Sequence, residues 1–355
     1  MVGKRQYDAI VIGAGPAGAM AARTIALCGA HTLMIDRASK GRWKVCGCCL
    51  GSVGVDVLHK TGLERVLEHA DPIEGLMLSA RGACARLAMH GFASISREDL
   101  DVALVDAAEA AGVETRWRQS ATASPDGRVV AGNEELRAGV VIDASGLRSH
   151  ADRAPRGGRI GLGLTTDATI CPPKMLTMAV AHGGYLGRVA LPDGRVDFAM
   201  AVRPSLVRSA GSPTEAARRI WAESGLDPSE VPDGRWFGTP VLRRRAQAQD
   251  GRILRAGDAA GYVEPFTGEG MSWALLGGSE ITGDAMACIE HGPDALRWPR
   301  TLRSLLGRRH ARCKAISNAV RSPRLVRAAI GLARLTPSAS ASATAMLSGS
   351  RRSVA

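Results

Sequence analysis

The sequence has few aromatic residues: Phe, Trp and Tyr together make up 4% of its 355 residues. None of them follows Trp298, although the chain is strongly basic beyond that point. Proteins that bind single-stranded nucleic acids stack bases on aromatic side chains placed among basic residues. The scarcity therefore argues against nucleic-acid binding, and we expect no nucleic-acid partner.

The sequence also lacks any run of about 18 apolar residues, the length that a membrane-spanning helix needs. The apolar segment 9–22 follows Lys4 and Arg5 as in a signal peptide, but Asp8 precedes it and glycines interrupt it. Eight cysteines are too sparse for a disulfide scaffold, and no second CxxC pair accompanies Cys46 and Cys49 to complete a zinc site. We expect a cytoplasmic protein without a bound metal.

Acidic residues are absent from one end of the chain. From residue 295 onward there are thirteen Lys and Arg and no Asp or Glu, whereas residues 1–294 carry 33 basic against 34 acidic side chains. The net charge of +12 thus comes from a basic C-terminal region on a nearly neutral body. Such asymmetry is typical of a docking surface or a tail.

The N-terminal region has the pattern of a βαβ unit. Residues 7–12 and 32–35 predict strands, and the segment 20–30 between them has helical periodicity. Gly13, Gly15 and Gly18 lie at the turn from strand to helix, where glycines permit a tight turn, the approach of a pyrophosphate and close helix packing. Asp36 ends the second strand, where its carboxylate can bind a ribose. Together these features predict a dinucleotide-binding site.

Further along the chain, helices and strands alternate. Ser96 as N-cap, two acids in the first turn and Gly112 as stop predict an amphipathic helix between them. Residues 74–94 and 160–245 are mostly strand-like, with a short helix at 212–224. A strand at 253–256 leads through a glycine-rich turn to a helix from about 268 to 291. Two more helices, broken at Ser322 and Pro323, end the chain before a flexible tail.

Four motifs occur in a diagnostic order: GAGPAG at 13–18, SREDLDVALVDAAEAAG at 96–112, VVIDASG at 140–146 and GDAAGYVEPFTGEGM at 257–271. In this order they resemble the FAD-dependent oxidoreductases with the para-hydroxybenzoate hydroxylase fold. The segment EPFTGEG, together with KVCG at 44–47, is similar to the geranylgeranyl reductase branch of that group. The flavin halogenase motif W-x-W-x-I-P is absent.

The resemblance implies a set of FAD-binding residues. Asp36 is expected at the ribose, Arg97 near the phosphates, Asp258 at the ribityl chain, and the turn 265–270 beside the flavin ring, where a helix N-terminus favours negative charge. The full set of expected cofactor-binding residues is Gly13, Gly15, Pro16, Ala17, Gly18, Asp36, Arg37, Lys44, Cys46, Gly47, Arg97, Asp143, Gly146, Gly257, Asp258, Pro265, Gly268, Glu269, Gly270 and Met271.

Cys46 is the candidate catalytic residue. It matches the cysteine of the K-x-C-G motif, which the resemblance places near the flavin, where its thiol could polarise or protonate a substrate carbon. The alternative is that Cys46 is simply a small buried thiol, since free cysteines are often buried.

These patterns predict an α/β protein with a Rossmann-type FAD-binding domain, a β-rich substrate domain and C-terminal helices. We assign residues 1–75, 95–159 and 246–294 to the FAD-binding domain and residues 76–94 and 160–245 to the substrate domain. Residues 295–337 form a basic helical region, and residues 338–355 form a flexible tail.

The predicted function is FAD-dependent redox chemistry on a small hydrophobic or lipid-like substrate, favouring reduction of a carbon–carbon double bond. A monooxygenase acting on an aromatic or polyketide substrate and a flavin-binding partner protein without turnover remain alternatives. Because only one dinucleotide fingerprint occurs, the expected donor NAD(P)H must dock without its own βαβ unit, or electrons arrive from a donor protein.

The basic region suggests two further alternatives. Its arginines could rest on an anionic membrane surface with Leu302, Leu305, Leu306 and Ile316 available on another face, which would make the protein peripheral at the inner face of the membrane. Otherwise these apolar side chains pack on the FAD-binding domain and the arginines form a solvated face.

Overall fold

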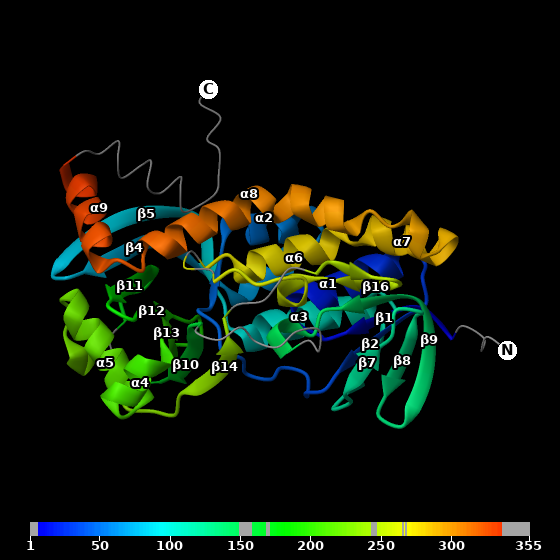
Figure 1. The fold of residues 1–355 in the computed structure, drawn as a ribbon, viewed down its shortest axis with the longest axis horizontal. Helices are drawn as coiled ribbons and strands as arrows, with labels where there is room; N and C mark the ends of the chain where they lie inside the picture. The colour runs from blue at the N-terminus through cyan, green and yellow to red at the C-terminus, as the bar shows by residue number, and fades with distance from the viewer. Residues whose placement is uncertain are drawn as a thin grey trace.

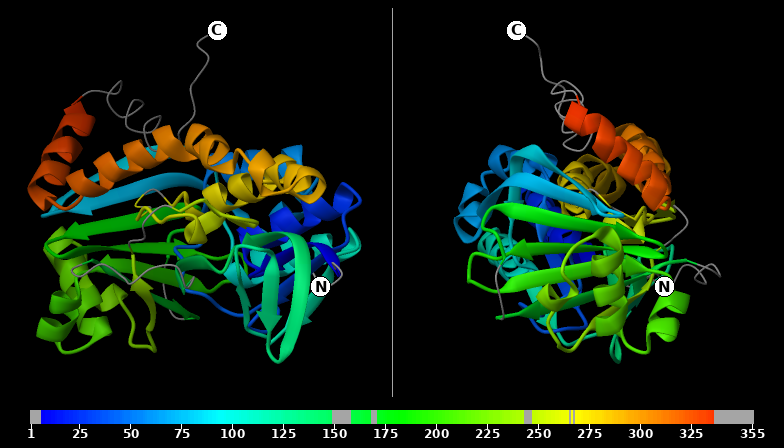
Figure 2. Two further views of the ribbon diagram at one scale, coloured as in Figure 1. Left: turned by 45° about the vertical axis from the view of Figure 1, so that its right-hand side comes forward. Right: turned by 90° about the vertical axis from the view of Figure 1, so that its left-hand side faces the viewer.

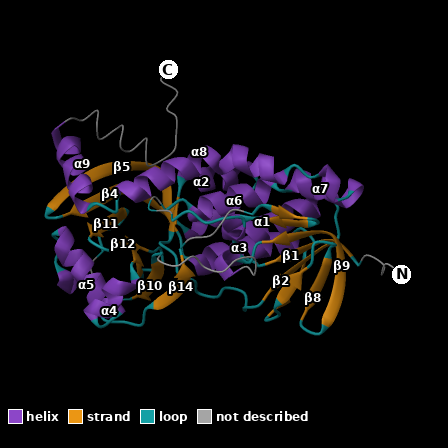
Figure 3. Cartoon of the chain, viewed as in Figure 1, coloured by secondary structure: helices purple, strands orange, loops and turns teal. Residues whose placement is uncertain are grey.

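The protein has two β-sheets at opposite ends of an elongated molecule, with helices filling the middle and covering one side (Figures 1 and 3). The structure is a computed structural model that describes residues 6–148, 158–167, 171–242, 247–264, 266 and 268–335. The expected tail 338–355 and the expected cofactor-binding residue Pro265 lie outside these residues. Both the mixed α/β class and the C-terminal helices were predicted from the sequence.

The first sheet has a parallel core in the order β16, β9, β1, β2, β6. The short strand β15 pairs with β16, and the hairpin of β7 and β8 extends from β9. All the carboxyl ends of the parallel strands lie at one edge, where open α/β sheets bind ligands. The strands span Tyr7–Ile12 (β1), Thr32–Asp36 (β2), Glu114–Trp117 (β6), Ala121–Ala123 (β7), Arg128–Ala131 (β8), Glu134–Asp143 (β9), Gln249–Asp250 (β15) and Ile253–Arg255 (β16).

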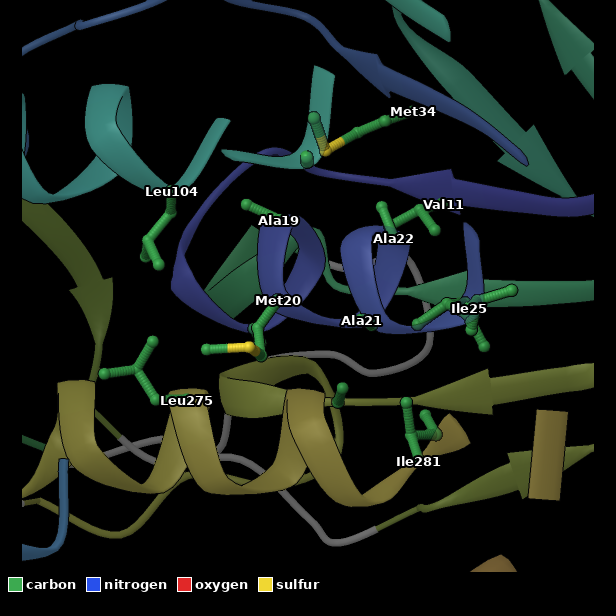
Figure 4. Close-up of a cluster of buried hydrophobic side chains, with 14 of the residues drawn as sticks. Val11, Ala19, Met20, Ala21, Ala22, Ile25, Met34, Leu104, Leu275 and Ile281 are labelled. Carbon is green, nitrogen blue, oxygen red and sulfur yellow. The ribbon is translucent and has the colours of Figure 1, made fainter. Parts of the chain in front are cut away.

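Helix α1 (Pro16–Leu27) lies between this sheet and helices α3 (Arg97–Ala110) and α6 (Gly270–Glu280). Figure 4 shows Met20 of α1 facing Leu275 of α6, with Val11 of β1 and Ala22 of α1 close together. These side chains are fully buried in one apolar cluster. The small residues of α1 allow the three helices to pack closely, which fixes the start of α1 relative to the sheet edge.

The single helix predicted from about 268 to 291 is two helices, α6 and α7 (Thr282–His291). The hydroxyl group of Thr282 lies 3.2 Å from the Ser279 carbonyl oxygen and 2.6 Å from Thr24 Oγ1 of α1. A threonine hydroxyl that hydrogen-bonds a nearby backbone carbonyl competes with the helical ladder. The contact with Thr24 favours the break at this point.

The second sheet has the order β14, β10, β13, β12, β11, β4, β5, β3 and is mostly antiparallel. The short strands predicted at 74–94 are two long ones, and β4 pairs in parallel with β11. The strands span Cys49–Leu50 (β3), Asp71–Ala80 (β4), Ala83–Ser94 (β5), Ile160–Thr166 (β10), Met175–Ala181 (β11), Gly184–Ala190 (β12), Val196–Val202 (β13) and Phe237–Val241 (β14).

Shorter helices border the second sheet: α2 (Ser52–Lys60), α4 (Pro204–Ala210) and α5 (Pro213–Ser224). Ser212 caps α5 as the sequence suggests, and Trp221 of α5 packs edge-on against Phe198 of β13. Brief 3₁₀ turns occur at Glu64–His69, Gly146–Arg148, Pro228–Glu230, Gly257–Ala259 and Pro293–Ala295. The division into FAD-binding and substrate domains stays a prediction.

Two basic helices complete the described chain, α8 (Trp298–Ala319) and α9 (Pro323–Leu335), and they break where Ser322 and Pro323 predict. Figure 2 shows α8 running along the molecule and α9 lying across the end of the second sheet, on β4 and β5. No helix in the described part of the chain is long and apolar enough to cross a membrane.

The apolar face of α8 is packed on the body of the protein. Leu306 is buried, and Leu302, Leu305 and Ile316 are partly buried against the core clusters. The apolar side chains of α8 therefore pack on the protein as the second alternative expects, but Ile316 contacts the cluster of the second sheet and not the one around α1. Exposed leucines occur instead on α9, as described below.

Candidate active site

A large cavity lies at the carboxyl edge of the parallel sheet and extends to the second sheet. Its volume is about 1340 Å³, which exceeds the roughly 300–1,000 Å³ of pockets for drug-sized ligands. Residues that end β1, β2, β9 and β16 line one part of it, and side chains of β11 to β13 line another. It is large enough for a dinucleotide and a second molecule.

The start of α1 is shaped for close contact with a ligand. Gly13 has a φ of +104°, and a methyl group there would lie 2.4 Å from the Ala144 carbonyl oxygen. A methyl group on Gly18 would lie 1.8 Å from the Gly13 carbonyl oxygen, so only glycine permits this packing. The N-cap residue Gly15 provides no side-chain cap, which leaves the helix N-terminus available to an anion.

Two cations stand beside Gly15. A methyl group on Gly15 would be 3.6 Å from Arg97 Nη2 and 4.0 Å from Lys44 Nζ. Asp101, which is nearly buried, accepts hydrogen bonds from both: Arg97 Nε and Nη2 at 3.0 and 2.9 Å, and Lys44 Nζ at 2.7 Å. One carboxylate thus orients two positive charges at a helix N-terminus, an arrangement that suits a pyrophosphate.

Asp36 lies at the end of β2, as predicted. Its Oδ2 accepts a hydrogen bond from the Ala14 amide at 2.8 Å, and its Oδ1 accepts one from the Ala38 amide at 2.8 Å. Each carboxylate oxygen has a second lone pair for a further donor. The aspartate is therefore fixed in place and retains the capacity to bind ribose hydroxyl groups in the cavity.

Residues from the ends of β9 and β16 form the next part of the wall. Asp143 accepts hydrogen bonds from the amide and hydroxyl groups of Ser145, at 3.2 and 2.6 Å. Buried Arg255 lies beside it, with Nε 3.5 Å from Asp143 Oδ2. Gly257 and Asp258 follow in a 3₁₀ turn that opens on the cavity.

Cys46 lines the cavity, and its side chain packs against both the core cluster around α1 and the cluster under the second sheet. A hydrogen bond with Cys48 lowers the pKa of the Cys46 thiol to about 6, against the effect of burial, and Arg97 contributes to the lowering. The same hydrogen bond, with burial, raises the pKa of Cys48, and burial raises the pKa of Cys49 to about 12. Of the three neighbouring thiols, Cys46 is the one poised to exchange a proton near neutral pH.

The part of the cavity under the second sheet is largely apolar. Tyr185 and Phe266 meet edge to face with ring centroids 4.9 Å apart. Behind them a buried ion pair joins Arg159 Nη1 to Glu264 Oε1 at 2.7 Å. The side chains that line this part include Leu176, Met178, Tyr185, Leu242, Tyr262 and Phe266.

Most of the residues predicted from the sequence meet in this cavity. Gly18 packs against Gly13 instead of lining it, and Glu269 is buried behind it. The predicted residues that line the cavity are Gly13, Gly15, Pro16, Ala17, Asp36, Arg37, Lys44, Cys46, Gly47, Arg97, Asp143, Gly146, Gly257, Asp258, Gly268, Gly270 and Met271.

Sequence reasoning missed several residues of the site. Asp101 lies four residues after Arg97, a spacing at which two side chains of a helix meet. Because Asp101 also lies next to the apolar positions 100 and 104, the sequence could have indicated a buried ion pair between Asp101 and Arg97. Tyr185 and Tyr262 are two of only three tyrosines in the chain, but nothing in their local sequence indicates a cavity. In the described residues, no cluster of His, Cys, Asp and Glu is placed to hold a metal ion.

Comparisons with known proteins agree with this geometry. Residues 6–155 match a family model described as an FAD binding domain. The geranylgeranyl diphosphate reductase of Rhodobacter capsulatus is 30% identical over 314 residues, covering 82% of this chain and 78% of the relative. The digeranylgeranylglycerophospholipid reductase 2 of Methanopyrus kandleri is 26% identical over 313 residues, covering 79% and 77%.

Solved structures share the fold over nearly the whole chain. A geranylgeranyl bacteriochlorophyll reductase-like protein from Thermoplasma acidophilum has a TM-score of 0.77 at 18% identity, covering 97% of this chain and 96% of its own. A probable FAD-dependent monooxygenase from Pseudomonas aeruginosa has a TM-score of 0.75 at 18% identity, covering 91% and 99%.

The fold and the cavity define an FAD-dependent oxidoreductase. The sequence similarity also identifies the family, since the reductase from Rhodobacter capsulatus matches along most of both chains. The chain belongs to the geranylgeranyl reductase family of these flavoenzymes.

Proposed function

We propose that this enzyme reduces a carbon–carbon double bond of an isoprenoid-like substrate that binds in the apolar part of the cavity. The observation that carries this proposal is that Cys46 lines the same cavity as the dinucleotide-type turn and the apolar side chains, and packs against the core clusters of both parts of the protein. The names of the relatives, which are reductases of geranylgeranyl and digeranylgeranyl compounds, support the same reaction class.

The cofactor-binding roles follow from the geometry described above. We propose that the N-terminus of α1, Arg97 and Lys44 bind the pyrophosphate, and that Asp36 binds the adenosine ribose. Asp143 and Asp258 line the same cavity, and we propose that they bind polar groups of the central part of FAD. The chemistry that FAD would supply here, once bound and reduced, is hydride transfer to carbon.

The side chains of this protein supply the rest of the reaction. Tyr185, Phe266 and Met178 of β11 exclude water from an apolar chain and hold one double bond near Cys46. Cys46 holds a proton at this position and delivers it to the second carbon of the double bond. The thiol pKa of about 6 allows proton transfer near neutral pH.

Mass analysis of products tests the proposal. The purified holoprotein, reduced under anaerobic conditions, is incubated with geranylgeranyl diphosphate or with a digeranylgeranyl glycerolipid. We expect the product to gain one H₂ for each reduced double bond. A product that gains one oxygen atom in air, from an aromatic or polyketide substrate, would instead establish the monooxygenase alternative.

A product set that is unchanged with every substrate would favour a flavin-binding protein without turnover of its own. The fold is shared with a probable monooxygenase, and fold similarity alone does not separate double-bond reduction from oxygen transfer. The test for oxygen transfer is therefore needed.

For the electron donor, we propose NAD(P)H. The described part of the chain has one dinucleotide-type turn, at the edge of the parallel sheet, and we assign that turn to FAD. NAD(P)H therefore has no βαβ unit of its own here, and its nicotinamide would reach the flavin from the solvent side of the cavity. Anaerobic mixing with NADPH or NADH should bleach the bound flavin. If neither bleaches it and a reduced ferredoxin does, the donor is a protein.

We also propose that the outer face of α9 rests on an anionic membrane. Leu325 and Leu332, seven residues apart and therefore on one face, are each 60% exposed, and Arg321 and Arg324 beside them are exposed as well. On the other side of the helix, Arg327 and Arg334 donate hydrogen bonds to the carbonyl oxygens of Arg81 and Cys84. These contacts would fix the leucines at the surface, next to a lipid-soluble substrate.

A further inference from the structure

Two arginines at one end of the cavity have no acidic partner. Arg42 lines the cavity and is exposed, and Arg235, two residues before β14, is exposed as well. Within the described part of the chain neither guanidinium group forms an ion pair, and the acid nearest to Arg235 in the sequence, Asp233, pairs with Arg218 at 3.2 Å. The proposed reaction makes no use of these two positive charges.

An aromatic pair holds Arg235 beside the cavity. The guanidinium carbon of Arg235 lies 4.9 Å from the centre of the Phe237 ring, and the ring centroids of Phe237 and Trp43 are also 4.9 Å apart. Both aromatic residues line the cavity, and Phe237 is 42% exposed. Because a guanidinium group that stacks on a ring keeps its N–H donors in its own plane, Arg235 remains able to bind an anion.

Hydrogen bonds fix the orientation of Trp43. Its Nε1 donates to Thr165 Oγ1 of β10 at 2.9 Å, and Thr165 Oγ1 donates to Oδ1 of buried Asp197 of β13 at 3.0 Å. The indole ring is thereby anchored on two strands of the second sheet. Since Arg42 directly precedes Trp43, the same anchor holds the backbone of Arg42 at the cavity.

The segment 43–47 crosses the second sheet in a definite direction. A methyl group on Gly163 of β10 would lie 3.4 Å from the Trp43 ring. A methyl group on Gly47 would lie 3.9 Å from Cβ of Ala199, on β13. The segment therefore starts over β10, which pairs with the edge strand β14, and reaches β13 at the candidate cysteine.

The apolar part of the cavity lies further across the same sheet. Among its lining residues, Leu176 and Met178 belong to β11 and Tyr185 belongs to β12. The strand order is β14, β10, β13, β12, β11, and neighbouring strands are about 4.8 Å apart, so the two ends of this row are roughly 20 Å apart. A long substrate in the cavity meets the arginines at one end, Cys46 on the way and apolar side chains at the other end.

We propose that Arg42 and Arg235 bind the diphosphate head group of an isoprenoid diphosphate, whose chain passes Cys46 into the apolar part of the cavity. This inference rests on the proposed double-bond reduction and names the head group of its substrate. A guanidinium group binds a phosphoryl group through two parallel N–H···O hydrogen bonds. Two such groups without acidic partners match the two phosphoryl groups of a diphosphate, whereas a neutral head group would leave both charges unmatched.

The phosphate groups of NAD(P)H share this chemistry, so the test has to separate the donor from the substrate. The substrate is the occupant that accounts for the whole arrangement. Its first prenyl units, next to the diphosphate, would cover the exposed ring of Phe237 and the neighbouring Trp43, and the rest of its chain would continue along the same cavity.

The first experiment measures binding to the oxidised holoprotein, in which no double bond is reduced. Calorimetric titration compares geranylgeranyl diphosphate with geranylgeraniol, which has the same chain and no phosphate. In Arg42→Gln/Arg235→Gln the Kd for the diphosphate should rise at least about tenfold, because hydrogen bonds between charged groups are lost. The Kd for geranylgeraniol should stay unchanged.

Matched variants separate direct contact from general attraction. Arg65→Gln/Arg208→Gln removes the same charge at exposed positions that do not line the cavity, and should bind the diphosphate as the wild type does. Phe237→Leu removes the ring under Arg235 and should raise the Kd for the diphosphate, although less than the loss of both arginines. An equal rise in both arginine double variants would overturn the proposed site, because it would indicate long-range attraction only.

The second experiment asks whether the two arginines serve the electron donor instead. The wild type and Arg42→Gln/Arg235→Gln are titrated with NADP⁺, and their flavin is bleached anaerobically with NADPH. We expect both measurements to be the same for the two proteins. If the variant loses affinity for NADP⁺ and binds geranylgeranyl diphosphate normally, the arginines belong to the donor site and the inference is wrong.

The outcomes separate this inference from the proposed function. An unchanged Kd for the diphosphate in the variant, or no binding of the diphosphate to the wild type, would overturn the head-group site even if the enzyme reduces another isoprenoid. Binding that depends on the two arginines, without any reduced product, would refute the proposed reaction and support the head-group site.

Discussion

Arg97 and Asp101, one turn apart on α3, form a two-point ion pair in which Arg97 Nε lies 3.0 Å from Oδ1 and Nη2 lies 2.9 Å from Oδ2. The arginine side chain is 15% exposed and the aspartate side chain 5%. Because Lys44 also binds this carboxylate, Asp101 orients both cations beside Gly15.

Asp101→Ala should therefore destabilise the protein by about 3 kcal/mol or more, since removing one partner of a buried pair leaves an uncompensated charge. Chemical denaturation of the variant and the wild type measures the loss. Asp106→Ala is the matched control. Asp106 lies on the same helix as Asp101, is exposed and pairs with Lys40, so its removal should lower the stability by less than about 1 kcal/mol. Equal losses in both variants would refute the role of Asp101.

Asp36→Ala should weaken FAD binding by about 1.5–3 kcal/mol, the contribution of hydrogen bonds to a charged group. This corresponds to roughly a 10- to 150-fold rise in Kd. Titration of the apoprotein with FAD, followed by flavin fluorescence, gives the value. Asp8→Ala serves as control, because Asp8 accepts the His31 amide at 2.9 Å and does not line the cavity. An FAD affinity equal to that of the wild type would rule out the assignment of Asp36 to the ribose.

Cys46→Ser should lower turnover by a factor of about 10² to 10⁴, the usual contribution of a general acid, because a serine hydroxyl does not ionise near neutral pH. The size of the cavity and the packing change little, so flavin content and Tm should stay close to those of the wild type. Steady-state kinetics and thermal melts on the same preparations check both expectations. A parallel loss of activity and stability would indicate that Cys46 is a packing residue.

The stability of the protein should fall as the pH drops from about 6.5 to 4. Burial between α6 and α8, with a contribution from Lys314, lowers the pKa of His310 from 6.5 to about 4. In this pH window the unfolded chain binds a proton that the folded protein excludes, so protonation favours unfolding, and the stabilisation is complete only above pH 6.5.

His310→Gln should flatten this part of the curve of Tm against pH. The replaced imidazole stacks edge to face on Trp273, with ring centroids 4.7 Å apart, so the variant should also start from a lower Tm at pH 8. His291→Gln, at an exposed position, is the control and should retain the wild-type slope. If His310→Gln has the same slope as the wild type between pH 6.5 and 4, another group causes the decline.

Vesicle binding should depend on the outer face of α9. The double variant Leu325→Gln/Leu332→Gln should bind anionic vesicles at least tenfold more weakly, because burying one leucine side chain contributes roughly 1.5 kcal/mol or more. Leu27→Gln, equally exposed at the end of α1, is the matched control and should bind as the wild type does. Co-sedimentation at low and high salt checks the charge contribution, since salt screens the exposed arginines. Full binding by the double variant would exclude α9 as the docking face.

Local patterns in the sequence were enough for the dinucleotide-binding unit. The strand, the glycine turn, the helix and Asp36 follow one another within 30 residues, and the hydrogen bond from the Ala14 amide to Asp36 spans only 22 residues. The same holds for the Ser96 cap of α3 and for the break between α8 and α9, because caps and prolines act within one helical turn.

The rest of the site was decided by tertiary structure. The parallel pairing of β4 with β11 joins segments about a hundred residues apart. No short-range pattern in the sequence specifies which strand will pair with which. The hydrogen bond from Trp43 to Thr165 spans 122 residues, and the burial of Asp197 follows from the strands around it. The sequence by itself determined the dinucleotide turn and the candidate cysteine. Only the packing of the two sheets decided which side chains line the cavity with that cysteine, because burial and proximity depend on contacts between distant segments.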